Sequence, residues 1–333
     1  MATLNNDVLT LADWAKRLDP MGKYGKIIEV LTQTNEIIND MAVLEGNLPT
    51  GHRVNIRTGL PDVYWKIINQ GVKASKSTVA QITSQCGKLT GYSRVEKDLA
   101  EIGGGDHGAK MRLSEGSAFL QSLNNEMARA IFYGDESKDP EQFTGLSARY
   151  SKIAGVESGQ NVIDGGGTGM NNCSIWHVEW GEDAACAHFP KGSKMGVSHN
   201  DLGLRVFKDD DDRISTEYVD EWKWSLGLFV KDWRKVVRIA NINVDELQKQ
   251  SNSAAKIVEL LIKSHYRIPN PGMARTAIYM NRTCAQYLDI EQYKNVKGAG
   301  MTYKDVQGKR LYEFRGIPIR ICDALLNSES RVV

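Results

Sequence analysis

The sequence predicts an α+β fold in which helices and strands follow one another without regular alternation. One long amphipathic helix is expected over residues 108–133, because apolar residues recur there every four positions: Phe119, Leu123, Met127 and Ile131. Elsewhere apolar and polar residues alternate, as in antiparallel strands that bury one face. No β–α–β order repeats along the chain, so a doubly wound parallel sheet is not expected.

The composition is that of a globular protein. The chain has 333 residues, enough for two domains, and its 41% hydrophobic and 25% charged residues exclude a mainly disordered or fibrous class. The longest apolar stretches, such as Leu226–Val230 and Ile257–Ile262, are far shorter than the ~20 residues that span a bilayer. No basic segment followed by an apolar run opens the chain, so we expect no membrane contact and a cytosolic protein.

Net charge and cysteine usage narrow the function further. The five cysteines are scattered without a C-x-x-C pair, which indicates free thiols in a reducing compartment. The net charge is only +1, whereas proteins that grip many phosphates normally carry a large positive excess. If the protein meets DNA, we therefore expect it to contain the DNA and not to clasp it.

The first fifty residues favour helices. Thr10 and Asp13 predict a capped start, and Trp14 lies on the apolar face of the helix that follows. A second helical pattern runs through residues 27–41 and is expected to end near Gly46. Trp14 fits either ordinary core packing or a terminal arm that docks on a neighbouring subunit.

Residues 51–100 are polar and rich in strand-forming residues, with apolar positions spaced by two. Gly59–Asp62 is predicted to form a turn. Such a segment cannot build a core of its own, so it is either a long hairpin lying on another surface or a flexible insertion. A hairpin that needs a partner surface is a common assembly device.

The next seventy residues are built around the long helix. Gly103–Gly105 break the chain before it, and Gly134 is expected to end it in the left-handed conformation typical of helix C-termini. Residues 155–172 are predicted to form a loop around the glycines at 165–169.

The second half is predicted to mix strands and helices. Strands with one buried face are expected over 173–180, 184–189 and 222–230, the second returning after a turn at 181–183. Asn243 is expected to cap a helical region that breaks at 251–253. The remaining elements are a strand near 277–280, a helix near 284–288, a loop at 298–300, and two strands at 311–315 and 317–321.

The sequence contains few candidate metal-binding or catalytic residues. Cys173, His177, Cys186 and His188 could bind zinc by residue type, but their C-x3-H and C-x-H spacing fits no familiar site, and their convergence depends on strand register. We interpret them as ordinary strand residues, the acidic run 209–212 as a solvated loop tip, and the glycine clusters as flexible joints. No catalytic motif is present, so we expect no enzyme and no cofactor or metal.

Four blocks, in this order, carry a resemblance. In Ala128–Tyr150 a helix ends in an aromatic-Gly-Asp turn before a Phe-x-Gly-Leu loop, and Ser174–Val197 joins two strands before a Pro-Lys-Gly-Ser turn. Trp222–Ile242 and Arg310–Leu326 follow, the latter with a Gly turn between strands. Together they resemble the major capsid proteins of tailed bacteriophages, with the Hong Kong-type phage capsid fold that encapsulin shells share. The chain looks most like the short form, without an immunoglobulin-like insertion.

The resemblance implies a domain organisation. It assigns residues 1–50 to an N-terminal arm, 51–100 to an extended E-loop hairpin, 101–170 to the spine helix and peripheral domain, 171–301 to mixed peripheral and axial segments, and 302–333 to C-terminal strands returning to the peripheral domain. The loop Lys294–Met301 is the candidate for the tip of the axial domain. Candidate interface residues are Trp14, Arg57, Tyr64, Trp65, Lys73, Lys294, Lys297, Gly298 and Gly300.

The resemblance also implies the function and partners. Copies of the chain are expected to assemble into hexamers and pentamers of an icosahedral shell around double-stranded DNA, with a scaffold protein, a portal and a possible decoration or cement protein. We expect assembly in the cytoplasm of a host bacterium and a final location in the virion capsid. Two alternatives stay open: an encapsulin-like compartment with protein cargo, and a metal-dependent enzyme that uses the four Cys and His residues.

Overall fold

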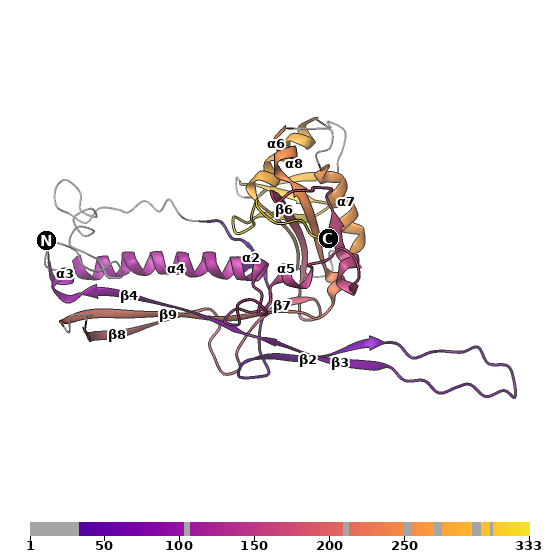
Figure 1. The fold of residues 1–333 in the computed structure, drawn as a ribbon, viewed down its shortest axis with the longest axis horizontal. Helices are drawn as coiled ribbons and strands as arrows, with labels where there is room; N and C mark the ends of the chain where they lie inside the picture. Colours follow the sequence, from indigo (N-terminus) through magenta and orange to yellow (C-terminus); the bar gives the residue numbers. More distant parts are fainter. Residues whose placement is uncertain are drawn as a thin grey trace.

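The computed structural model describes residues 33–102, 107–208, 213–249, 255–269, 275–294, 301–306 and 309–333. The molecule is elongated and has three parts (Figure 1): a long helix lying on a sheet, a compact unit at one end of that helix, and a hairpin that projects past both. The fold is α+β, as the sequence predicts. No helix in these described ranges has the length and apolar character needed to cross a membrane.

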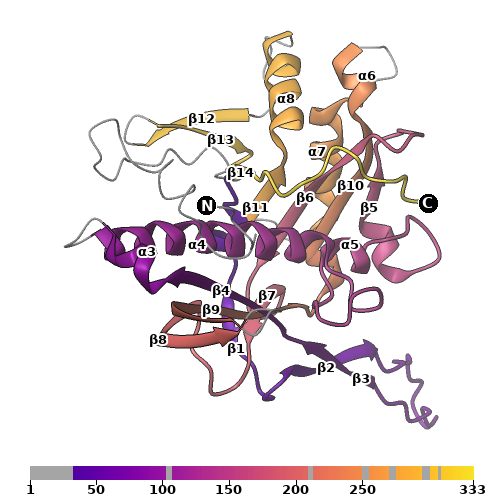
Figure 2. The ribbon, with the colours of Figure 1, turned by 60° about the vertical axis from the view of Figure 1, so that its left-hand side comes forward.

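The long helix α4 (His107–Tyr133) follows the short α3 (Lys97–Glu101), close to the predicted bounds. It lies on a sheet in which β9 (Ile214–Val230) runs between β4 (Gly87–Glu96) and β8 (Val197–Lys208) (Figure 2). The apolar face of α4 is buried against these strands. Gly116 is required at the contact, because a Cβ there would lie 2.8 Å from the indole of Trp222.

Gly134 ends α4 for a different reason from the one predicted. Gly134 is not among the described residues that have a positive φ angle, so it does not adopt the left-handed conformation. Instead the chain passes so closely that a Cβ on Gly134 would lie 2.4 Å from the carbonyl oxygen of Phe143. The Gly145 amide donates to the Gly134 carbonyl at 2.8 Å, which fixes this return of the chain.

The compact unit is built on one twisted sheet. Across the sheet its strands are β5 (Val162–Asp164), β10 (Val236–Asn243), β6 (Asn172–Trp180), β11 (Arg275–Met280), β14 (Ile317–Ile321), β13 (Lys309–Phe314) and β12 (Met301–Val306). Every residue of β6 is buried, which corrects the prediction of one buried face. Trp176 and Val178 face the cluster around α4, whereas Cys173 and Ile175 face the cluster under α7 (Ile257–Arg267) and α8 (Arg282–Lys294).

Strand β7 (Ala185–Phe189) does not fold back on β6 as predicted. It meets β6 only where Trp180 lies beside Ala185, and it pairs along its length with β9 and with β1 (Val43–Glu45). β9 therefore runs from the sheet under α4 into the compact unit and joins the two. The predicted helix through residue 41 is described only at its end, as α2 (Ile37–Asp40), and β1 follows where the helix was expected to continue.

Several local predictions are decided by hydrogen bonds. Asn243 caps α6 (Val244–Lys249), since its side-chain oxygen accepts from the Glu246 amide at 3.1 Å. The predicted loop 155–172 contains the 3-10 helix η1 (Glu157–Asn161) and β5. Its glycines are not flexible joints, because the amides of Gly165 and Gly167 donate to the carbonyls of Ala240 and Asn241.

The remaining short elements are α5 (Leu146–Arg149) and η2 (Trp233–Lys235). The predicted helix near 284–288 is longer than expected and forms α8. The two predicted C-terminal strands are present as β13 and β14, and Arg315 and Gly316 make the turn between them with positive φ angles. These strands join the sheet beside β11, and the chain then crosses back to the end of α4.

A buried polar network holds that crossing in place. Glu329, in the C-terminal tail, pairs with Arg238 of β10 at 2.8 Å, and both side chains are at least nine-tenths buried. Glu329 also accepts from the hydroxyl of Tyr133 at the end of α4 and from Ser174 of β6. Arg238 also donates from Nε to the Ser174 hydroxyl and from Nη1 to the Tyr150 carbonyl. The network ties helix, sheet and tail into one body.

Arg238→Met is expected to lower the free energy of unfolding of the free subunit by about 3–5 kcal/mol, because it leaves Glu329 buried without its partner. Urea unfolding measures the change. The matched control is Arg234→Met, which breaks the exposed Arg234–Asp232 pair and should cost less than about 1 kcal/mol. Equal losses in the two variants would contradict the role given to the network.

Candidate assembly interface

The projecting hairpin is a sheet of its own. β2 (Gly51–Gly59) and β3 (Thr78–Gln85) pair antiparallel from Gly51 opposite Gln85 to Gly59 opposite Thr78. Beyond them residues 60–77 run out and back with extended backbone (Figure 1). The hairpin ends at Gln85 and not at residue 100, the limit that the sequence predicts. Residues 87–96 form β4, which pairs with β9 in the sheet under α4.

The hairpin reverses farther out than predicted. Gly59–Asp62 is extended and not a turn. The chain reverses at Ile67–Gln70, where the Gln70 amide donates to the Ile67 carbonyl at 3.0 Å and Asn69 has a φ of 69°. Asn tolerates this left-handed conformation better than most residues. Gly59 and Pro61 are typical turn residues and led to the prediction, whereas Asn69 is the residue at which the chain reverses.

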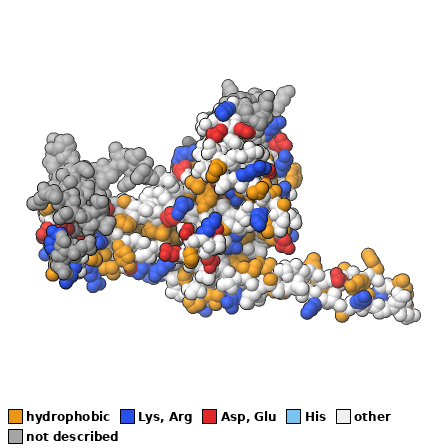
Figure 3. Space-filling view, viewed as in Figure 1, with side chains coloured by type: hydrophobic (Ala, Val, Ile, Leu, Met, Phe, Trp, Pro, Cys, Tyr) orange, Lys and Arg blue, Asp and Glu red, His pale blue; other side chains and the backbone are white. Residues whose placement is uncertain are grey.

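The outer hairpin exposes large apolar side chains. Trp65 is fully exposed and Val63 is 89% exposed. The other exposed large apolar residues of this segment are Leu60, Tyr64, Ile67, Ile68, Val72, Val79 and Ile82. Figure 3 shows hydrophobic side chains along the projecting arm, on the face turned to the viewer. Contiguous exposed apolar surface of this kind marks an interaction site.

The hairpin is also basic. Arg53, Arg57, Lys66, Lys73 and Lys76 are opposed by one acidic residue, Asp62, which gives residues 51–85 a net charge of +4. Since the whole chain carries +1, the other residues together carry −3. The hairpin is therefore the basic part of a chain that is nearly neutral as a whole, and its exposed lysine and arginine side chains can meet acidic side chains of a partner surface.

The base of the hairpin is firmly anchored. The Ser84 hydroxyl donates to the Leu228 carbonyl of β9 at 2.8 Å, and Arg149 of α5 donates to the same oxygen at 2.9 Å. The Ser84 carbonyl lies 3.3 Å from Nε2 of His188 on β7. Because three elements of the compact unit hold the base, the direction in which the hairpin projects is set by the fold.

Two histidines pack at this base. The rings of His52 and His188 lie 5.7 Å apart, and His52 meets the Phe229 ring edge-on. Burial lowers the pKa of His188 to about 4, with a smaller contribution from the neighbouring His52. Burial and the charge of Lys231 lower the pKa of His52 as well. Both imidazoles are therefore neutral at pH 7.

The sheet under α4 is held by ion pairs. Arg112 of α4 contacts Asp220 of β9 and Asp201 of β8, each at 2.8 Å. Arg94 of β4 pairs with Glu217 of β9 at 2.7 Å. These contacts fix the three strands beneath the helix and leave the opposite face of α4 free of the sheet, with Leu113 and Leu120 exposed.

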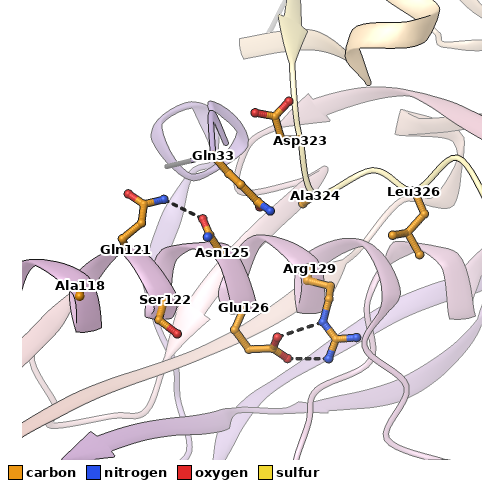
Figure 4. Close-up of a pocket in the computed structure, with 10 residues that line it drawn as sticks. All are labelled: Gln33, Ala118, Gln121, Ser122, Asn125, Glu126, Arg129, Asp323, Ala324 and Leu326. Atoms are coloured by element: carbon orange, nitrogen blue, oxygen red, sulfur yellow. Dashed lines mark hydrogen bonds and ion pairs between the residues drawn. The ribbon is translucent and has the colours of Figure 1, made fainter. Parts of the chain in front are cut away.

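That opposite face of α4 carries a groove of about 460 Å³ (Figure 4). Its floor is α4 and its far wall is the C-terminal tail; the lining includes Gln33, Gln121, Asn125, Arg129 and Asp323. Gln121 donates to Asn125 at 2.7 Å, and the Arg129 guanidinium is occupied by Glu126. Both carboxylates of the lining are paired, Glu126 with Arg129 and Asp323 with Arg282, so the groove is a contact surface lined mainly by polar residues.

The predicted interface residues fall in two places. Arg57, Tyr64, Trp65 and Lys73 all lie exposed on the hairpin, and Lys294 is the last residue of α8 in the compact unit. Trp14, Lys297, Gly298 and Gly300 lie outside the described residues, as do the runs 209–212 and 251–253. Ile67 and Ile68 are also exposed there and were not among the predicted interface residues; the alternation of Val63, Trp65 and Ile67 was the available signal for Ile67.

The four candidate metal ligands do not converge. Strand β7, which carries Cys186 and His188, pairs with β9 and not along β6, which carries Cys173 and His177. Cys173 contacts Cys284, and Nδ1 of His177 lies 3.3 Å from the Ser264 hydroxyl, on the α7 side of β6. Cys186 is on β7, opposite Phe229 of β9, and His188, also on β7, lies at the hairpin base. Within the described ranges, no three His, Cys, Asp or Glu side chains are placed to hold a metal ion.

Comparison with known proteins gives a consistent result. The family model described as major capsid protein GP7 matches residues 19–333. A chain in the near-atomic structure of bacteriophage Epsilon15 is 30% identical; the match covers 100% of this chain and 99% of that one, with a TM-score of 0.78. A chain of the bacteriophage JBD30 capsid is 12% identical, with 89% and 93% coverage and a TM-score of 0.46. No curated protein matches the sequence.

Acidification should weaken the free subunit through His188. The unfolded state binds a proton near pH 6.5 and the folded state only near pH 4, so stability is full above 6.5 and is lost as the pH falls. By pH 4 the loss from this residue is about 3 kcal/mol. In His188→Gln, urea unfolding between pH 7 and 4 should show a shallower decline. An unchanged slope would contradict the assignment.

Trp65→Ala should change the free energy of unfolding of the free subunit by less than about 0.5 kcal/mol, since the side chain is fully exposed. The control is Trp176→Ala in the core, which should cost about 3–5 kcal/mol. Thermal or urea unfolding compares the two. A large loss at Trp65 would mean that the hairpin packs against its own subunit.

Proposed function

Because the chain belongs to the family of the major capsid protein GP7, we propose that its copies assemble as hexamers and pentamers into the icosahedral shell of a tailed bacteriophage, around double-stranded DNA. The family membership makes it a structural protein of a phage capsid. The observation that carries the finer proposal is the basic, apolar hairpin, whose outer part is exposed and is not covered by any described part of its own subunit.

A projecting hairpin favours closed rings. The contact joins two different surfaces, the hairpin of one copy and the body of the next, so it is heterologous and repeats head to tail. Such a contact leaves no hairpin uncovered when the rotation between copies closes a ring of five or six. An isolated two-stranded hairpin is marginally stable in water, so the covering surface also stabilises it.

The energy of one contact need not be large. Obligate assemblies bury about 2,000–5,000 Å² per interface, and long arms supply such areas more readily than compact faces. The charge of +4 on the hairpin adds attraction wherever it meets acidic side chains of a neighbouring copy. Many modest contacts that close together hold a shell through their combined effect.

The capsid family also suggests names for the three parts. We assign the hairpin as the E-loop, α4 with β4, β8 and β9 as the peripheral domain, and the sheet centred on β6 as the axial domain. This proposal moves the strands of 302–333 from the peripheral domain expected from the sequence to the axial domain. The loop 294–301 stays the candidate tip, and its residues 295–300 lie outside the described ranges. A scaffold protein, a portal and a decoration or cement protein are the proposed partners, and the host cytoplasm is the proposed site of assembly. The net charge of +1 supports containment of DNA without tight binding.

The test removes the outer hairpin. Gly59 and Thr78 are ladder partners, so an Asn-Gly turn can replace residues 60–77 without disturbing β2 and β3. Electron microscopy should show closed shells for the wild type with its scaffold, and folded, soluble subunits without shells for the variant. Shells built by the variant would refute the proposal, as would wild-type particles filled with protein cargo and free of DNA when isolated from infected cells.

A charge variant provides a matched control. Lys66, Lys73 and Lys76 changed to Glu reverse the hairpin from +4 to −2 and should slow or abolish shell formation at low salt. The same three-residue change at Lys138, Lys152 and Lys191, which are exposed outside the hairpin, should leave assembly intact. Light scattering follows both reactions, and equal effects would show that only net charge matters.

A further inference from the structure

Two cysteines that are far apart in the sequence meet inside the compact unit. Cys173 of β6 and Cys284 of α8 are 111 positions apart, yet their Sγ atoms lie 2.9 Å from each other. Both side chains are fully buried, and both thiols are free in this structure. The sulfurs must approach by only about 0.9 Å to reach the ~2.05 Å of a disulfide bond.

The surrounding contacts hold this approach. Cys284 is in the first turn of α8, where its amide donates to the Asn281 side chain at 2.8 Å. The Cys173 thiol is also within reach of the Ile242 carbonyl, at 3.5 Å. The pair sits in the apolar cluster between the sheet and helices α7 and α8. The backbone of both elements therefore fixes the two sulfurs together before any bond forms.

The other three cysteines have different surroundings. Cys86 donates to the His188 carbonyl, Cys322 donates to the Asn35 side chain, and Cys186 is buried on β7 opposite Phe229. All five cysteines belong to the described residues, and this is the single pair among them with sulfur atoms in contact.

We propose that Cys173 and Cys284 form a disulfide within each subunit when the protein meets an oxidising medium, with a low-molecular-weight disulfide as the oxidant. One thiolate attacks the oxidant and releases its first thiol, and the second thiolate then attacks the mixed disulfide and releases the other. Two protons leave the protein, and two electrons reduce the oxidant to two thiols. The bond joins the central strand of the compact unit to the helix that covers it.

Burial makes the reaction slow in both directions. The hydrogen bond to Cys173 and burial raise the pKa of Cys284 well above its usual range, so the reactive thiolate is scarce at neutral pH. Oxidation must therefore wait for local opening of the unit, and reduction of the finished bond is hindered in the same way. Formation of the bond does not rest on the proposed function. The stage at which it forms does, since a shell leaves the reducing cytoplasm of the cell only after assembly.

The test uses the purified full chain treated with the oxidised form of 2-mercaptoethanol, in buffer and in urea below the unfolding transition. Thiols are then counted by alkylation after denaturation. The count should fall from five to three, the intact mass should drop by two hydrogen atoms, and peptide mapping should find Cys173 joined to Cys284. Subdenaturing urea should accelerate the change.

Two variants sharpen the result. Cys186→Ala should still form the bond and lose two thiols. Cys284→Ala should form no disulfide within the protein, and any loss of the Cys173 thiol should appear as a mixed disulfide that adds the mass of one mercaptoethanol unit. The wild-type peptide map decides the question even if the latter variant fails to fold. Five thiols that persist through prolonged oxidation in urea would overturn the inference, as would a map that joins Cys173 to another cysteine. Electron microscopy of the same samples separates this outcome from the proposed function, because shells without the disulfide would reject the inference alone.

Discussion

The structure depends on one constraint: the outer half of the β2–β3 hairpin does not bury its apolar side chains against any of the residues that the structure describes. Trp65 and its neighbours are exposed, and within the described part of the chain the hairpin contacts the rest of the subunit at its base. Hydrophobic burial is the main favourable term in folding and association, so this exposed surface has to be covered by another molecule. The capsid family indicates that this molecule is another copy of the same chain.

The rest of the fold holds the hairpin in one direction. β9 runs from the sheet under α4 into the compact unit and pairs there with β7, whose His188 contacts the hairpin base. The Arg238–Glu329 network closes the C-terminal tail over the junction of helix and sheet. A hairpin on a loosely held base would lose its orienting value, because each added degree of freedom raises the entropic cost of association.

Local signals in the sequence predicted local structure well. The four-residue apolar repeat predicts α4, and Asn243 with Glu246 predicts the cap of α6, because both signals act within one or two helical turns. Features set by distant contacts were not predictable in this way. The pairing of β7 with β9, the close approach at Gly134 and the burial of both faces of β6 depend on segments many residues away. Within the hairpin, the spacing of apolar residues predicted strands, but it did not locate the reversal at Asn69.

Hydrogen exchange measures the central claim most directly. The backbone of residues 60–77 has few hydrogen bonds within the subunit, so its amides should exchange in the free subunit almost as fast as in an unfolded chain. In assembled particles the account predicts strong protection of these amides, since a neighbouring copy covers them. If residues 60–77 were already protected in the free subunit, or stayed unprotected in closed shells, the hairpin would not be the contact that builds the shell.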